Sequence, residues 1–196
     1  QPGLTLVALT TNAGGAINYR GKRLSLYANY NFDHRKDKFV MDIKRHFYQP
    51  GTKSIQTTLQ QASTMRVGGN NHTAQVGLDY TINAKQSFGF VANGSFNQGD
   101  FDSYSPVNFL GTGGTLDSIS TSRNHTGYNW NNAGANAHYN WNMDDKGSSI
   151  VANLDYNRFY QSMPQNIQTA TTNSDGDTLH DPIDRQGRQP NHIDIY

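Results

Sequence analysis

The sequence lacks cysteine and long hydrophobic runs, and it carries few charges. Only 16% of its 196 residues are charged, and 16 Lys+Arg against 15 Asp+Glu leave a net charge of +1. Without cysteine, disulfides and thiolate metal sites are excluded, and the near-neutral balance gives no electrostatic reason to expect a nucleic-acid partner. No run reaches the roughly 18 apolar residues of a transmembrane helix, so that class is excluded too.

Uncharged polar residues account for the low mean hydropathy of −0.76. The chain holds 19 Gly and 22 Asn with many Ser, Thr and Gln, while 11 Tyr, 9 Phe and 2 Trp argue against intrinsic disorder. This composition favours a β-protein with one apolar face and one neutral polar face. The sequence opens at Gln1-Pro2-Gly3 with neither Met nor a signal peptide, so we expect a mature chain or a piece of a longer one.

Apolar and polar residues alternate with a period of two, which predicts strands whose two faces differ. From Leu24 to Asp33 the even positions are apolar and the odd positions largely polar. The same pattern recurs over residues 74–82, 88–97, 133–141 and 150–157. Leu4 to Thr11 and Gly15 to Arg20 alternate less cleanly but fit a further pair of strands. With His192 to Tyr196 as another beginning, we count seven strands and the start of an eighth.

Tight and long connections alternate along the chain. Turn residues with a basic side chain form three tight connections, at residues 20–23, 83–86 and 143–147. Three long connections lie between them: Lys36 to Asn71, Gln98 to His125 and Gln161 to Asn191. Because the long connections all fall at the same end of the hairpins, the pattern is typical of an outer-membrane barrel with short periplasmic turns and long extracellular loops.

A soluble β-sandwich or barrel alternates in the same way, so the chemistry of the two faces must discriminate. About two dozen positions on the apolar faces carry no charge, as a lipid-facing surface requires. The opposite faces hold Asn, Ser, Gly, Thr and Asp, which suit an enclosed wet lumen. Aromatic residues gather toward strand ends, like the belts at bilayer interfaces. These features predict an all-β, antiparallel up-and-down transmembrane β-barrel.

Several segments resemble one known family. The run AINYRGKRLSLYANY, from Ala16 to Tyr30, resembles a hairpin of TonB-dependent receptor barrels, the outer-membrane β-barrel family abundant in Bacteroidota. Asp42 to Phe47 is similar to a segment that follows that hairpin in the family, and Val76 to Phe90 is similar to a later hairpin. Gln1 to Thr11 resembles the first barrel strand, which follows the plug domain.

The resemblance implies that residues 1–196 are part of one outer-membrane β-barrel domain, whose plug and remaining strands lie elsewhere, since such receptors close with about 22 strands. It implies uptake of a scarce nutrient across the outer membrane of a Gram-negative cell. The implied partners are outer-membrane lipid and lipopolysaccharide, the plug domain and the TonB energy-coupling complex. Importers of siderophores, glycans, cobalamin and peptides share this wall, so the substrate class stays open.

Two sets of side chains are candidates for ligand binding. His138 lies on a predicted lumen face, where it either binds ligand or is ordinary polar lining. A basic cluster follows the third strand and could contact lipopolysaccharide phosphates or another anionic ligand, a solvated loop edge being the alternative. Its members are Lys36, Lys38, Lys44, Arg45 and His46. Within it, Lys44 and Arg45 are the candidate ligand-binding residues.

Metal binding and catalysis find little support in the residue spacing. The stretch from Asn173 to Asp177 loosely resembles a calcium loop, with Asp175, Asp177 and Asp181 as candidate ligands, but it lacks the full spacing and the terminal Glu. A Gly-Asp turn in a solvated loop is the alternative. The histidines show no H-x-x-H or HExxH spacing, G-x-S-x-G is absent, and no helix follows the glycines at 111–114. We therefore expect neither enzymatic activity nor a cofactor.

Two other classes remain open. One is a complete small eight-stranded outer-membrane barrel with an adhesive or structural role. The terminal aromatic Tyr196 favours it, whereas His192 to Tyr196 is too short to span a bilayer and Asp194 interrupts its apolar alternation. The other is a soluble β-sandwich that binds glycan through exposed Tyr and Trp.

Overall fold

The computed structural model describes residues 3–144 and 146–196, so Gln1, Pro2 and Asp145 of the predicted segments lie outside the described residues. The chain forms one antiparallel up-and-down sheet with 84% of its residues in strands, which confirms the predicted all-β class. The strands are β1 (Gly3–Arg20), β2 (Leu24–Tyr48), β3 (Ile55–Asn83), β4 (Gln86–Leu110), β5 (Leu116–Asn142), β6 (Ser149–Ser162), β7 (Gln165–Asn173), β8 (Thr178–Gly187) and β9 (Pro190–Ile195). A short 3-10 turn, η1 (Thr112–Gly114), connects β4 to β5.

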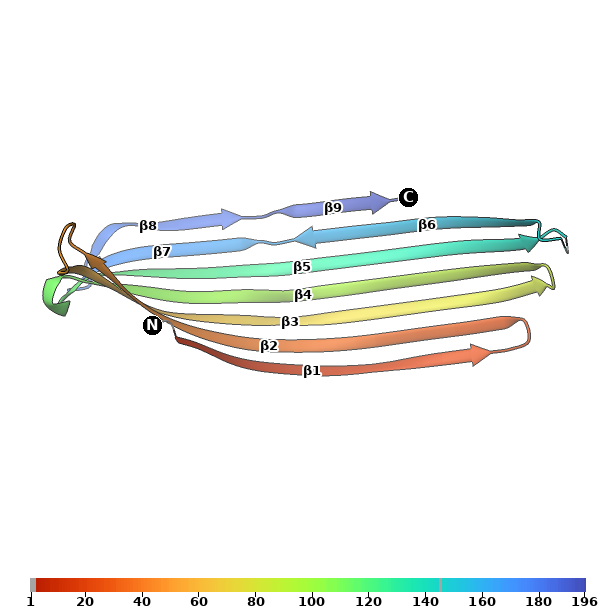
Figure 1. Ribbon diagram of the computed structural model, residues 1–196, viewed down its shortest axis with the longest axis horizontal. Coiled ribbons are helices and arrows are strands. Elements are labelled where there is room, and N and C mark those ends of the chain that lie inside the picture. Colours follow the sequence, from red (N-terminus) through yellow and green to blue (C-terminus); the bar gives the residue numbers. More distant parts are fainter. Residues whose placement is uncertain (1–2, 145) are drawn as a thin grey trace.

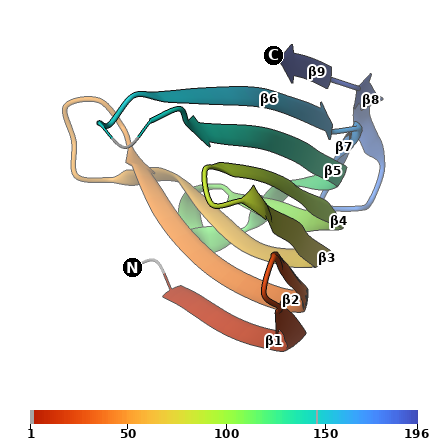
Figure 2. The same ribbon diagram turned by 90° about the vertical axis from the view of Figure 1, so that its right-hand side faces the viewer.

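The nine strands form seven rows. Strands β1 to β6 are neighbours in sequence order (Figure 1). β6 and β7 both pair with β5, along its residues 129–142 and 118–126, so together they make one interrupted row. β9 pairs with β6 and β8 with β7, which makes a second interrupted row. β1 therefore lies at one edge of an open sheet, and β8 with β9 at the other (Figure 2).

The long connections expected from the sequence are wrong. Strand pairing continues through them, and only residues 49–54, 111–115 and 174–177 separate the strands at that end of the sheet. Between Lys36 and Asn71, for example, β2 and β3 stay paired from Lys36 opposite Gly68 out to Phe47 opposite Thr57. The reason is chemical: charged residues such as Lys36 and Lys38 replace the apolar residues of one face, and Phe39 and Met41 lie on the other face. The alternation therefore changes phase although the backbone ladder continues.

The predicted pair of strands at the N-terminal end is one strand, β1, which runs through Gly14 and Gly15 without a turn. A Cβ added at Gly14 would lie 2.0 Å from Oδ1 of Asn31, the residue directly opposite. The prediction of two strands is therefore wrong here, because Gly14 marks a close approach of a side chain to the backbone within one strand.

The three tight turns are where the sequence predicts them, between β1 and β2, β3 and β4, and β5 and β6. In the first, the Gly21 amide donates to the Leu24 carbonyl at 2.7 Å. In the second, Oδ1 of Asn83 accepts from the Lys85 amide at 2.9 Å. These short side-chain and backbone bonds fix the register of each hairpin.

The register assigns side chains to two faces, because residues directly opposite each other in an antiparallel pair point the same way. We call one the band face; its central row is Leu26, Leu78, Phe90, Ala137 and Leu154. We call the other the glycine face, because every described glycine whose added Cβ would come closer than 3.0 Å to a neighbour lies on it: Gly14, Gly69, Gly77, Gly89, Gly99 and Gly134. Side chains on the glycine face thus fold over the backbone.

A buried hydrophobic core is absent from the described residues. The apolar side chains nearest the tight turns stay open on the band face, where Leu26 is 40%, Val76 49% and Leu154 73% exposed. No other part of the described chain packs on the band face, so its apolar surface can be covered only by another molecule or by residues outside the described chain.

Candidate functional site

Charge is absent from the band face near the tight turns and appears farther along each strand. Counted from the tight-turn end, the first Lys, Arg or Asp on this face is Lys36 in β2, Arg66 in β3, Asp100 in β4, Arg123 in β5 and Arg158 in β6. The nearest of these to its turn, Arg158, lies nine positions beyond Ser149. We call the uncharged part the apolar band.

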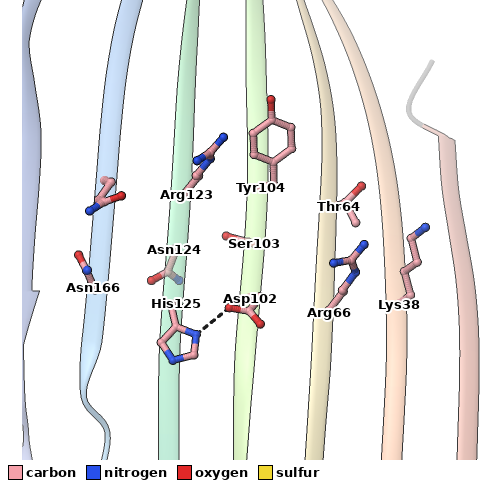
Figure 3. Close-up of a pocket in the computed structure, with 11 residues that line it drawn as sticks. Lys38, Thr64, Arg66, Asp102, Ser103, Tyr104, Arg123, Asn124, His125 and Asn166 are labelled. Atoms are coloured by element: carbon pink, nitrogen blue, oxygen red, sulfur yellow. Dashed lines mark hydrogen bonds and ion pairs between the residues drawn. The ribbon is translucent and has the colours of Figure 1, made fainter.

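Beyond the apolar band, a hollow of about 500 Å³ opens on the band face across β2, β3, β4, β5 and β7. Figure 3 shows the side chains that surround it. We call it the cationic hollow; it is lined by Lys38, Thr64, Arg66, Asp102, Ser103, Tyr104, Arg123, Asn124, His125, Asn166 and Gln168. Five neighbouring rows of one sheet therefore build the site without any loop.

The strand register brings these side chains together. Lys38 is directly opposite Arg66, and Arg66 is directly opposite Asp102. Asp102 in turn is opposite His125. Next to this row, Tyr104 is opposite Arg123. Since opposed residues in an antiparallel pair have Cβ atoms about 5 Å apart, these groups interact directly.

Asp102 pairs with His125, so it does not form an ion pair with Lys38 or Arg66. Its Oδ1 lies 2.7 Å from Nδ1 of His125, as the dashed line in Figure 3 marks. The guanidinium carbon of Arg123 lies 5.5 Å from the centre of the Tyr104 ring, a cation–π contact. Within the described residues, Lys38 and Arg66 have no ion pair. The hollow therefore offers positive charge to an incoming anion.

The predicted basic cluster lies on a strand, and alternation divides it between the faces. Lys36, Lys38 and Lys44 lie on the band face, whereas Arg45 lies on the glycine face opposite Leu59. His46, also on the band face, places Nδ1 2.9 Å from Oγ1 of Thr58. The two candidate ligand residues Lys44 and Arg45 consequently lie on opposite faces of the sheet, and only Lys38 of the cluster lines the cationic hollow.

His138 lies on the glycine face of β5, over Gly89 of β4. A Cβ at position 89 would meet the imidazole at 2.1 Å, and Nε2 of His138 lies 3.6 Å from Oδ1 of Asp79. The side chain is 30% exposed, so glycine below and carboxylate beside it hold the ring in a defined position. His138 is therefore fixed on the glycine face of the sheet.

The loosely calcium-like stretch forms the turn between β7 and β8. Oδ1 of Asn173 accepts hydrogen bonds from the amides of Asp175 at 3.0 Å and Asp177 at 2.8 Å, and Gly176 supplies the positive φ of 93°. Asp181 lies beyond the turn in β8. No group of three His or acidic residues suited to a metal ion occurs in the described parts of the chain.

The glycine face carries a second polar hollow, of about 460 Å³, whose lining includes Arg35, Asp37 and Tyr128. Asp37 is buried and pairs with Nε of Arg35. The Tyr128 hydroxyl donates to the Gly68 carbonyl at 3.2 Å. Burial, and then the nearby Asp100 carboxylate, raise the pKa of Tyr128 above its ordinary value. This hollow places ionisable groups on the face opposite the cationic hollow.

Sequence reasoning missed Arg66, Asp102, Arg123 and His125, because all four fall in segments expected to be loops. A usable signal was present: positions 66 and 102 continue the even-numbered face of the strands beginning at residues 74 and 88. Extending the strands by parity alone would have placed these charges on one face.

Comparisons with known families, curated proteins and solved structures find no match to this chain. In addition, none of the helical residues described forms a segment able to cross a membrane.

Proposed function

We propose that the chain forms part of the wall of an outer-membrane β-barrel of the TonB-dependent receptor type, which takes up a scarce nutrient in a Gram-negative cell. The observation that carries the proposal is the apolar band: an exposed, uncharged face that extends at least nine residues from the tight turns in each of the five strands β2 to β6. A strand needs about nine to eleven residues to cross the hydrocarbon at a tilt.

The exposure of this face requires a cover. Apolar surface left in water costs roughly 25 cal/mol for each Å², and a whole sheet face of Leu, Val, Ile and Phe without a buried core is unfavourable in solution. Lipid chains provide that cover without a second protein layer. They also explain why charge is excluded, since Lys or Arg at the bilayer midplane costs about 2–4 kcal/mol.

Aromatic residues bound the apolar band on both sides. Toward the tight turns lie Tyr80, Phe88, Tyr139 and Trp141, and toward the far side lie Tyr30, Phe32 and Phe96. In β6, Arg158 lies in the row of Tyr30 and Tyr160 follows in the row of Phe32 and Phe96. In β2 the stretch of the band from Leu24 to Phe32 is about 26 Å of strand at 3.3 Å per residue, which is roughly 20 Å of height at the tilt of about 40° common in barrels. This height agrees with the aromatic girdles that flank the apolar zone of outer-membrane barrels.

The open edges favour a larger barrel over the other two classes. Because the sheet has seven antiparallel rows, its first and last rows run in the same direction and cannot pair antiparallel to close a barrel. Bacterial single-chain barrels close with an even number of strands. Further strands would allow the sheet to close, whereas a complete eight-stranded barrel would need an eighth full row. A glycan-binding sandwich needs a second sheet, and the described residues form one layer.

In this arrangement the glycine face lines the lumen, where it meets the plug domain and the permeating solute, and the polar halves of the strands extend above the membrane. The TonB complex supplies energy through the plug. The proposal predicts that the gene encodes a plug upstream of this segment and more alternating hairpins downstream, and reading the flanking sequence checks this directly.

A matched pair of variants tests the membrane role. Leu78→Lys places a charge on the band face, and Gln75→Lys places the same charge on the glycine face of the same strand. In the full-length protein, we expect Leu78→Lys to abolish recovery of heat-modifiable protein from the outer-membrane fraction and Gln75→Lys to preserve it. Equal recovery of both variants, or a wild-type protein found in the soluble fraction, would contradict the proposal.

A further inference from the structure

The cationic hollow lies at a defined height above the apolar band. Lys38 is six residues beyond Phe32, about 20 Å along the strand at 3.3 Å per residue. With the strand tilt of about 40° common in barrels, this is roughly 15 Å above the aromatic row. Bilayer headgroups add only about 5–8 Å on each side of the hydrocarbon. On the proposed function, on which this inference rests, the hollow therefore faces the saccharide layer above the outer leaflet.

The arrangement of charges in the cationic hollow destabilises the sheet. Lys38 and Arg66 are directly opposite each other, and like charges in that relation destabilise a sheet. Asp102 is directly opposite Arg66, but its carboxylate contacts His125. In the described chain, neither Lys38 nor Arg66 has an ion pair. An anion held between Lys38 and Arg66 would replace the repulsion with two attractive contacts.

A third cation is held in place by an aromatic ring. Arg123 lies with its guanidinium carbon 5.5 Å from the Tyr104 ring centre, which limits its motion and leaves its N–H edges available. The planar donor fork of arginine matches the oxygens of a phosphate group. Asn166 and Gln168 of β7 line the same hollow and add neutral amides, which are suited to sugar hydroxyls.

We propose that the cationic hollow binds a phosphorylated saccharide, with Lys38, Arg66 and Arg123 on the phosphate and the β7 amides on the sugar. Its source is the phosphorylated core of the outer-leaflet glycolipid, lipopolysaccharide, because the hollow faces outward on the same surface as the apolar band. The wall thus anchors itself laterally to the lipid that surrounds it, above the hydrocarbon rather than within it.

Bound lipopolysaccharide in the full-length protein, extracted from outer membranes in detergent, provides the test. The variant Lys38→Gln/Arg66→Gln/Arg123→Gln removes three charges from the hollow. The control Arg20→Gln/Lys22→Gln/Arg23→Gln removes three charges at the β1–β2 tight turn, at the opposite end of the strands. We expect the hollow variant to retain at least about tenfold less lipopolysaccharide per protein, as 3-hydroxy fatty acid, and the control to retain as much as the wild type. The single variant Arg66→Gln, expected to lose part of the lipid, covers the case in which the triple variant fails to assemble.

The outcomes separate the two proposals. A wild-type protein missing from the outer membrane overturns the proposed function. An outer-membrane protein whose assembled hollow variants retain wild-type amounts of lipopolysaccharide overturns only this inference. Titration of delipidated protein distinguishes the sources: binding of lipopolysaccharide micelles, lost in the hollow variants, supports the lipid source. Binding of glucose 1-phosphate or inorganic phosphate without binding of lipopolysaccharide would assign the site to a free solute and overturn the lipid source.

Discussion

The ring of Tyr27 lies over the backbone of Gly77, its directly opposed residue in β3. A Cβ built at position 77 would come within 2.2 Å of Cζ of Tyr27. The tyrosine therefore occupies the space that any other residue at position 77 would need, and the two positions form a matched pair on the glycine face.

Replacing this glycine tests the pairing. We expect Gly77→Val to destabilise the folded protein by about 1–3 kcal/mol, the usual cost of overpacking, because the Tyr27 ring must leave its position. The double variant Tyr27→Ala/Gly77→Val should recover much of that loss. Unfolding in urea, followed by tryptophan fluorescence, measures both. A double variant no more stable than the sum of its single changes predicts would show that the two positions do not share this space.

The β5–β6 turn should depend on pH through Asp144. The backbone amide of Ser148 is the main cause that holds the pKa of Asp144 below its ordinary 3.8, with the Ser148 hydroxyl and the Lys146 amide adding to it. A lowered folded-state pKa means that the carboxylate stabilises the turn fully above the unfolded value and loses that effect as pH falls through the lower folded value.

Hydrogen exchange at this turn measures the effect. As pH falls from about 4 to about 2, protection of the Lys146 and Ser148 amides should fall as Asp144 takes up a proton. Asp144→Asn keeps an oxygen acceptor without the titration, so its protection should stay level over the same range. Protection that falls equally in both proteins would rule out Asp144 as the cause.

Tyr128 should ionise at higher pH than an ordinary tyrosine. Burial is the largest cause of its raised pKa, and the Asp100 carboxylate adds to it. The neutral phenol is therefore favoured in the folded state, and its contribution to stability is lost as pH rises through the folded pKa. Ultraviolet titration of the wild type minus Tyr128→Phe isolates this group, and Asp100→Asn should bring its pKa closer to normal. A difference titration at the ordinary pKa would contradict the assignment.

The turn between β7 and β8, fixed by Asn173, should be stable without a metal ion. Its two amide hydrogen bonds already fix the turn, so removing divalent cations with EDTA from protein in detergent should leave the midpoint of thermal unfolding unchanged. Asn173→Ala should instead increase protease cleavage between β7 and β8, because both bonds are lost. A lower midpoint in EDTA that calcium restores would return Asp175, Asp177 and Asp181 to the list of metal ligands.

Sequence pattern predicted the parts of the fold whose two faces differ chemically. Around Leu26 and Val76 the neighbours on either side are polar, so the alternation is readable and the strands and tight turns are found. Around Lys38 and Arg66 the band face is charged, and the apolar residues Phe39, Met65 and Val67 lie on the glycine face. The pattern therefore changes phase although the backbone pairs without a break. The long loops were an inference from missing alternation, which reports face chemistry and not strand pairing.

The candidate site was only partly accessible from sequence for the same reason. Lys38 belonged to a recognised basic cluster, but its partners Arg66 and Arg123 come from strands that are distant in sequence. Their meeting depends on the register of three hairpins, which only the structure supplies. Conversely, Lys44 and Arg45 are adjacent in sequence and for that reason lie on opposite faces.

Depth in the bilayer tests the central claim most directly. The chain contains no cysteine, so single cysteines can carry a nitroxide label at Val76→Cys on the band face, Gln75→Cys on the glycine face and Arg66→Cys in the cationic hollow. In the full-length protein reconstituted in lipid, with any cysteine outside this segment replaced, spin relaxation by oxygen reports lipid and relaxation by a water-soluble nickel complex reports water. We predict that Val76 contacts lipid, whereas Gln75 and Arg66 contact water. Water contact at all three positions, with no difference between residues 75 and 76, would contradict a membrane-spanning wall.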